Sequence, residues 1–207
     1  MAILLNTKVR GVTIFRTLFY MPSLVPLVAS VVLFLWLLNP DFGLVNIGLR
    51  KLGIYPPGWF ADQRWAIPSL ILMGLWQSVG GTRMIIFLAG LQGIPDELYD
   101  AAAIDGAGTW GRIRHVTIPL LTPTIFFNLV LGIIGGLQVF AAAFVATEGG
   151  PAFATWFYGL HIYKHAFDYW NMGYASALAW FFAVIIVLLT IIQQRASRRW
   201  VFYYGGA

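Results

Sequence analysis

The sequence contains no cysteine, which excludes disulfides and thiolate metal sites and leaves the redox compartment unspecified. It also has little charge: 10% of its 207 residues are Asp, Glu, Lys or Arg, against about a quarter in ordinary soluble domains. Hydrophobic residues make up 59% of the chain. This balance excludes an ordinary soluble domain and predicts an all-α membrane protein, a polytopic helical bundle.

Several functional motifs are also missing. The phosphate-binding pattern G-x-x-x-x-G-K-[ST] does not occur, so the chain supplies no ATP site of that kind. The patterns H-E-x-x-H, H-x-x-E-H and G-x-S-x-G are absent, and the serines have no basic partner nearby in sequence, which argues against an intramembrane enzyme. His161 and His165 stand at i and i+4, a spacing that suits two metal ligands on one helix face. Because no third or fourth ligand is identifiable, we predict no metal site.

The positive charge is spread along the chain. The net charge of +5 would be compatible with nucleic-acid binding, but the basic residues lie at the ends of apolar runs and form no single patch. This distribution is typical of topology signals in membrane proteins, so we expect no nucleic-acid partner. The apolar start at residues 1–6 is too short for the apolar region and cleavage site of a signal peptide.

Four apolar runs are long enough to cross the lipid bilayer. The first carries no charge over 24 residues, more than the roughly 20 that a spanning helix needs. Pro22 and Pro26 lie within it, and are compatible with a bundle in which neighbouring helices satisfy the freed carbonyls. Gly132 and Gly136 in the third run form a GxxxG pair that would let another helix approach closely. The expected spans are residues 17–40, 65–92, 123–147 and 173–194.

A few polar and aromatic residues inside these spans are candidates for a substrate path. Arg83 is the one charge in the second span, and a charge at depth usually faces a cavity or a partner. For Arg83 we favour structural pairing over a role in the path. Asn128 and Gln138 in the third span are each either an interhelical hydrogen bond, which we slightly favour, or part of a polar path. Phe140 and Phe144, one turn apart, offer a surface on which a sugar ring would stack, although we favour ordinary bundle packing as their role.

The longest polar passage between the apolar runs covers residues 94–123. Pro95 suits the first turn of a helix, the acids after it complement the positive end of the helix dipole, and Gly106 is expected to end the helix. The simplest interpretation is a solvated loop helix that joins two spans. Four of the eight acids of the chain lie here within ten residues: Asp96, Glu97, Asp100 and Asp105.

A second short helix is expected to follow, capped by Thr109 and broken by Pro119. The residues of the first helix that share one stripe at helical spacing are Ile94, Leu98 and either Ala101 or Ala102.

The same passage resembles a family signature. The passage resembles the EAA motif, E-A-A-x3-G-x9-I-x-L-P, of permease subunits in binding-protein-dependent ABC importers. Here the motif reads D-A-A at 100–102, then Gly106 after three residues, then V-T-I-P at 116–119 after nine more. The departures are conservative: Asp for Glu at 100, Val for Ile at 116 and Ile for Leu at 118. The frame FLAGLQGIPDELYDAAAIDGAGTW resembles the sugar-type branch, that of the maltose and glycerol-3-phosphate permeases. The resemblance extends over nearly the whole chain.

The resemblance implies a function. It makes residues 94–122, approximately, the coupling loop that docks into a groove of a cytoplasmic ATPase, and residues 1–207 one transmembrane domain. The chain would be a non-enzymatic subunit that forms part of the path of a sugar or sugar-phosphate-like solute. A self-sufficient channel, like an intramembrane enzyme, stays an alternative, but it leaves the acidic passage without a purpose. The candidate coupling residues are Glu97, Asp100, Ala101, Ala102, Gly106 and Pro119.

The resemblance also implies partners. These are a second permease subunit, two cytoplasmic ATPase subunits that bind ATP and Mg, and an external solute-binding protein. No cofactor is expected in this chain. The expected location is the inner membrane of a bacterium or archaeon. The sequence does not identify the solute.

Charge predicts the orientation in the membrane. With four spans, eight Lys and Arg residues share the side of the passage 94–123, four lie on the other side, and Arg83 lies within the bilayer. The positive-inside rule then places the passage and both termini in the cytoplasm. The stretch NTKVRGVTIFRT resembles the second cytoplasmic loop of sugar-type permeases, which indicates either an N-terminally shortened permease or a genuine short start.

Overall fold

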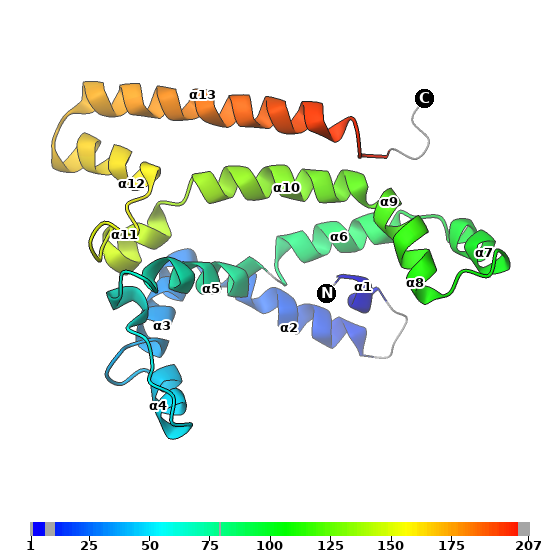
Figure 1. The fold of residues 1–207 in the computed structure, drawn as a ribbon, viewed down its shortest axis with the longest axis horizontal. Helices are drawn as coiled ribbons and strands as arrows, with labels where there is room; N and C mark the ends of the chain where they lie inside the picture. The colour runs from blue at the N-terminus through cyan, green and yellow to red at the C-terminus, as the bar shows by residue number, and fades with distance from the viewer. Residues whose placement is uncertain (1, 7–10, 79, 203–207) are drawn as a thin grey trace. The chain divides into compact units, whose positions relative to one another are not determined.

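The computed structural model describes residues 2–6, 11–78 and 80–202, and within them every regular element is a helix (Figure 1). η1 is a 3-10 helix, and η2 and η3 are π-helices. The elements are α1 Ala2–Leu5, α2 Val12–Leu24, α3 Leu27–Leu37, α4 Leu44–Lys51, η1 Trp59–Ala61, α5 Ala66–Ser78, α6 Thr82–Gln92, α7 Asp96–Ile104, α8 Thr109–Arg112, η2 Ile113–Thr117, α9 Ile118–Leu120, α10 Thr122–Leu137, α11 Ala141–Thr147, α12 Tyr158–Tyr163, η3 Lys164–Asp168 and α13 Met172–Ser197.

The described residues fall into two compact units. Unit 1 comprises Met1–Met21, Val79–Ile134 and Ile186–Ala207, and its core contains Leu91, Ile94 and Leu121. Unit 2 comprises Pro22–Ser78 and Gly135–Ile185. Its core brings together α3, η1, α5 and α11 through Val31, Phe34, Leu38, Phe60, Leu70, Met73 and Ala143.

Among the described helices, α13 alone is long and apolar enough to cross a membrane by itself. Three pairs of helices would raise the number of spans to four if each pair formed one span, and each pair bends by more than 40° at its break. The pairs are α2 with α3, α5 with α6, and the segment Thr109–Leu120 with α10. The architecture is therefore that of a helical membrane protein.

The first expected span, residues 17–40, is broken into α2 and α3. Proline at position 26 has no N–H and disfavours helical geometry at the residue before it, so α2 ends at Leu24. Pro26 itself is extended, with φ −55° and ψ 141°. Pro22 stays inside α2. One proline therefore breaks the helix and the other does not.

The second expected span, residues 65–92, is interrupted between α5 and α6 at a pair of glycines. Gly80 is buried, and a side chain on it would collide with the backbone carbonyl of Phe19. The break therefore allows α2 and the start of α6 to approach closely within unit 1.

The third expected span, residues 123–147, is not one helix. α10 ends at Leu137, and α11 starts at Ala141. The glycines at 135 and 136 lower the helix propensity of this end of α10, and the backbone of Phe140, with φ −138° and ψ −67°, lies outside the helical region. Residues 138–140 consequently form a non-helical link. The fourth expected span, residues 173–194, lies inside α13.

Candidate coupling site and substrate path

α7 starts directly after Pro95 and ends in a turn centred on Gly106. The N–H of Gly106 donates to the carbonyl of Ala103 at 3.1 Å, and the N–H of Ala107 donates to the carbonyl of Ala102 at 2.9 Å. This pair of bonds is a Schellman motif, which requires a left-handed residue after the helix. Gly106 fills that place with φ +79°, so the predicted end of the helix is confirmed.

One face of α7 is fixed to the rest of unit 1. Tyr99 packs against the core of Leu91, Ile94 and Leu121, and its hydroxyl lies 3.1 Å from the hydroxyl oxygen of Thr117 in η2. Thr117 is buried. This bond joins the helix before the turn to the helical segment after it, and it is a tertiary contact that no local sequence pattern predicts.

The opposite face of α7 is exposed along a stripe at i, i+3, i+4 and i+7. We call these four residues the coupling stripe: Glu97, Asp100, Ala101 and Ile104. Acidic side chains therefore lead into an apolar end, and Ile104 is 87% exposed. A single exposed apolar side chain is common on protein surfaces, so the significance of Ile104 depends on its place beside the two acids of the same stripe.

Ala102 lies outside the stripe, half-buried, on the face that also includes Leu98. The open choice between Ala101 and Ala102 is therefore resolved: Ala102 shares the inward stripe with Leu98, and Ala101 is exposed. Ile104 was missed because sequence periodicity shows which residues share a face but not which face the protein leaves open.

The segment after the turn differs from the expected second helix. The N-cap of α8 is Gly108, not Thr109, because Thr109 already lies within the helix and no side chain caps it. Pro119 does not break the segment but lies in the first turn of α9. The π-helix η2 directly precedes it and closes with the N–H of Ile118 bonded to the carbonyl of Ile113. This wider turn accommodates a residue that has no N–H to donate.

Pro119 belongs to an apolar groove and not to the coupling stripe. The groove has a volume of about 350 Å³. It is lined by Leu98, His115, Val116, Pro119, Leu120 and Phe202. Trp110, 74% exposed at the start of α8, is a second large apolar side chain beside the turn that sequence reasoning missed.

Two of the candidate path residues lie in unit 1. Arg83 in α6 is exposed, and one of its guanidinium nitrogens lies 3.5 Å from the point where a Cβ of Gly132 would stand. Within the described residues Arg83 forms no ion pair, and Gly132 leaves room for its guanidinium. Asn128 in α10 is buried, and its amide donates to the Thr124 carbonyl of the same helix at 2.9 Å. Its amide oxygen has no partner among the described residues.

The other three lie in unit 2. Gln138 is exposed in the non-helical link between α10 and α11. Phe140 and Phe144 are stacked, with ring centroids 5.5 Å apart and planes 20° apart. The ring of Tyr163 contacts both, at 5.1 and 5.0 Å. Phe167 also contacts Tyr163, at 5.0 Å, so the two rings named from the sequence belong to a cluster of four.

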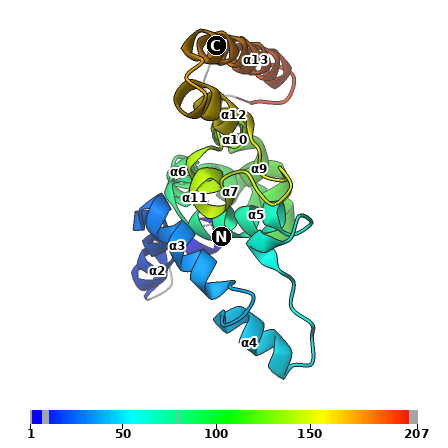
Figure 2. The same cartoon turned by 90° about the vertical axis from the view of Figure 1, so that its left-hand side faces the viewer.

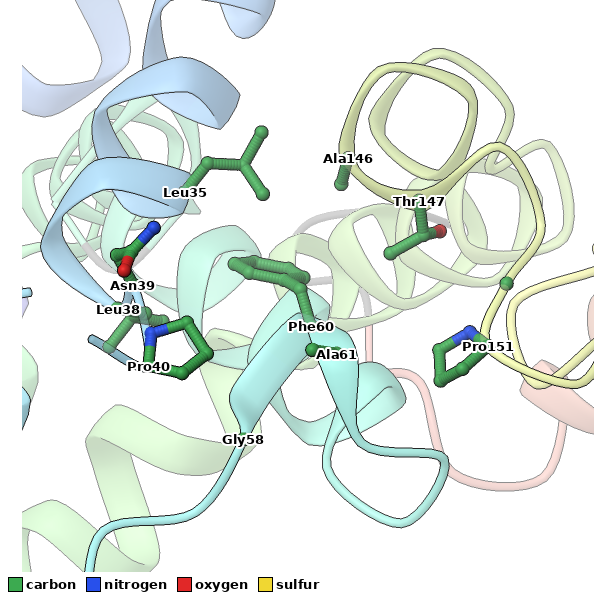
Figure 3. Close-up of a pocket in the computed structure, with 11 residues that line it drawn as sticks. Leu35, Leu38, Asn39, Pro40, Gly58, Phe60, Ala61, Ala146, Thr147 and Pro151 are labelled. Carbon is green, nitrogen blue, oxygen red and sulfur yellow. The ribbon is translucent and has the colours of Figure 1, made fainter.

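Unit 2 also contains a cavity of about 390 Å³ between the end of α3, η1 and the turn after α11 (Figure 3). The amide oxygen of Asn39 and the hydroxyl of Thr147 are already engaged. Asn39 accepts hydrogen bonds from the N–H groups of Asp41 and Phe42, and Thr147 bonds the carbonyl of Ala143 and the hydroxyl of Thr155. The cavity therefore offers few free polar groups to a sugar, and we assign it no substrate. Its lining is Leu35, Leu38, Asn39, Pro40, Gly58, Phe60, Ala61, Ala146, Thr147, Gly150 and Pro151.

The rings of His161 in α12 and His165 in η3 are in contact, with centroids 4.5 Å apart. The indole N–H of Trp156 donates to Nδ1 of His161 at 3.1 Å, so neutral His161 carries its proton on Nε2. Burial, and secondarily the charge of His165, lower the pKa of His161. Among the described residues no group of three His, Cys, Asp or Glu side chains is placed to hold a metal ion.

The chain is similar to a group of transport proteins. It matches the family described as "Binding-protein-dependent transport system inner membrane component" over residues 1–201. It is 40% identical to the probable ABC transporter permease protein YesP of Bacillus subtilis, over 98% of this chain and 66% of that protein. It is 37% identical to the lactose transport system permease protein LacF of Rhizobium radiobacter, over 95% of this chain and 67% of that protein.

Among solved structures, the chain is similar to that of a bacterial ABC transporter involved in the import of the acidic polysaccharide alginate. The TM-score is 0.87 and the identity 26%, over 96% of this chain and 70% of the other. The chain thus spans about two thirds of the length of the relatives that it matches. It belongs to the family of binding-protein-dependent transport system inner membrane components.

Proposed function

We propose that this chain is a permease subunit of an ATP-driven importer, and that α7 transmits the movement of a cytoplasmic ATPase to the solute path. The observation that carries the proposal is the coupling stripe: two acids, a small residue and an 87% exposed isoleucine on one face of a short helix whose opposite face is anchored. This arrangement suits a partner groove with basic residues and an apolar pocket. The candidate coupling residues of the sequence, Glu97, Asp100 and Ala101, lie on it.

The connections of α7 support a mechanical role. Three residues separate it from α6, and η2 and α9 lead from the turn into α10. α6 and α10 pack closely: a Cβ on Gly90 would stand 2.6 Å from the hydroxyl oxygen of Thr124 and 3.0 Å from the side chain of Leu121. A displacement of α7 would therefore move α6 and α10 together. Rigid-body movement of packed helices is a common means of opening and closing a path.

The solute class is inferred from relatives. Their names refer to lactose, to trehalose and maltose, and to sulfoquinovosyl glycerol, and the solved transporter imports alginate. We propose a sugar or sugar-phosphate-like solute, with Arg83, Asn128, Gln138, Phe140 and Phe144 along its path. The comparisons give no support to an intramembrane enzyme or a self-sufficient channel.

The proposed assembly contains components beyond this chain. They are a second permease subunit, two cytoplasmic ATPase subunits that bind ATP and Mg, and an external solute-binding protein. A solved alginate transporter is in complex with a periplasmic protein bound to an alginate pentasaccharide, which supports the last of these. We propose that the four expected stretches, residues 17–40, 65–92, 123–147 and 173–194, cross the membrane, the first three of them with a break in the helix. Both termini and residues 94–122 would then lie in the cytoplasm of a bacterium or archaeon.

Charge reversal tests the docking of α7. In the full-length permease, assembled with its partners, Asp100→Lys should weaken co-isolation of the ATPase and abolish solute-stimulated ATP hydrolysis, because like charges at an interface cost several kcal/mol. Asp41→Lys, at an exposed acid in unit 2, is the matched control and should change neither. Both variants are compared at equal membrane abundance. Normal association and coupled uptake with Asp100→Lys would refute the proposal.

A further inference from the structure

α4 is anchored to unit 2 by its inner face. Asn46 is 1% exposed, and its amide donates to the carbonyls of Asn39 and Pro40 at 3.2 and 3.3 Å. Its amide oxygen accepts from the indole N–H of Trp59 at 2.6 Å. The guanidinium of Arg50 donates to the carbonyl of Pro40 at 2.7 Å. These bonds fix α4 to the two residues at which the first apolar run ends.

The outer face of the same helix is apolar and uncovered. Leu44 and Ile47 share this face and are exposed, and Leu52, directly after the helix, is 76% exposed. Tyr55 follows at 95% exposure. In both views α4 stands apart from the other helices of unit 2 (Figures 1 and 2). The inner face of α4 is held by hydrogen bonds, so the exposed apolar side chains of the outer face are left without a cover.

Charge indicates what this cover is. α4 contains two basic side chains, Arg50 and Lys51, both in its last turn, and no acid; Asp41 precedes the helix, and Asp62 follows it after ten residues. Lys51 lies on the outer face, with Leu44 and Ile47, and is exposed. An apolar stripe edged by a basic side chain fits the boundary between acyl chains and phosphate headgroups.

From these contacts we infer that α4 lies on the membrane, with Leu44 and Ile47 in the acyl-chain boundary and Lys51 at lipid phosphates. The hydrogen bonds to the carbonyls of Asn39 and Pro40 hold α4 where the first apolar run, residues 17–40, ends and therefore meets water. This position favours a lipid surface over a protein partner. The apolar stem of lysine can lie along the boundary while its ammonium reaches the headgroups. The inference depends on the membrane location of the family and not on coupling to an ATPase.

These 207 residues contain no cysteine, so a label on an introduced cysteine reports on that position once any cysteine elsewhere in the transporter has been replaced. A nitroxide is attached at Ile47→Cys, or at Gln63→Cys as an exposed control, in the full-length permease within its transporter in bilayers containing phosphatidylglycerol. Power saturation then compares collisions with oxygen, which partitions into lipid, and with a water-soluble nickel chelate. We expect a several-fold higher oxygen-to-nickel ratio at position 47 than at position 63.

Two results would overturn the inference. A ratio at position 47 equal to that at position 63 would place α4 in water, and protection from both reagents would show that a protein covers it. In a second arm the anionic lipid is replaced by a neutral one, and Lys51→Gln is tested beside it. Each change should lower the ratio at position 47, and an unchanged ratio in both would refute the contribution of lysine to membrane binding.

Discussion

The hydroxyl groups of Tyr99 and Thr117 lie 3.1 Å apart and join the two arms of the proposed coupling loop. Tyr99→Phe keeps the packing of the ring but removes this bond, which is worth about 0.5–1.5 kcal/mol. We expect coupled uptake to fall partially while ATPase binding is retained. Thr117→Val also removes the 3.5 Å bond from the Thr117 hydroxyl to the carbonyl of Arg112, so it should lose at least as much, and the double variant should be little worse than Thr117→Val alone. Fully additive losses, measured as solute uptake in vesicles, would contradict a shared bond.

Gly106 and Gly108 provide a matched pair for the turn. Gly106 has φ +79°, with no atom within 4 Å of its missing Cβ, so a side chain there meets backbone strain and not a lack of space. Gly106→Val should cost about 1–2 kcal/mol and abolish solute-stimulated hydrolysis, whereas Gly106→Asn should be milder because asparagine tolerates this conformation. Gly108→Val should be tolerated, because Gly108 is extended with φ −68°. Equal effects of valine at both positions would refute the explanation.

The sequence predicted the start of α7 and its end at Gly106 because both depend on local backbone chemistry, namely the missing N–H of Pro95 and the left-handed glycine. It did not predict the break at residues 138–140 or the bend at Pro26, because an apolar run has the same composition whether one helix or two short ones cross it. The exposure of Ile104 depends on which face Tyr99 anchors. That is a tertiary contact, which periodicity cannot show.

Gln138 tests the proposed solute path. It is exposed in the non-helical link, where an amide has room to meet a polar solute. Gln138→Leu should lower solute transport while leaving assembly and basal ATP hydrolysis near normal. Gln194→Leu, at an exposed glutamine near the end of α13, serves as the control and should have no effect. Normal transport by Gln138→Leu would remove the residue from the path, and failed assembly would make its role structural.

His161 should make stability depend on pH. Its pKa lies below the ordinary value of 6.5, so the folded chain binds this proton less tightly than the unfolded chain. Stability should therefore be highest above pH 6.5 and decline as the pH falls through 6.5 toward the folded pKa. Protonation of Nδ1 would also remove the bond from Trp156. His161→Gln should flatten the dependence in thermal unfolding between about pH 8 and about pH 5.5. If His161→Gln leaves the dependence of thermal stability on pH unchanged, His161 is not its cause.

The docking of the coupling stripe to an ATPase is tested most directly by cross-linking at Ala101 and Ala103. Both alanines are exposed on α7, but only Ala101 lies on the stripe, and the chain has no cysteine of its own to interfere. Ala101→Cys and Ala103→Cys are each combined, in the assembled transporter, with single cysteines placed around the ATPase groove. We predict a cross-link from position 101 that changes in yield when ATP is bound, and little or none from position 103. Equal yields from the two positions, or none from position 101, would contradict the account.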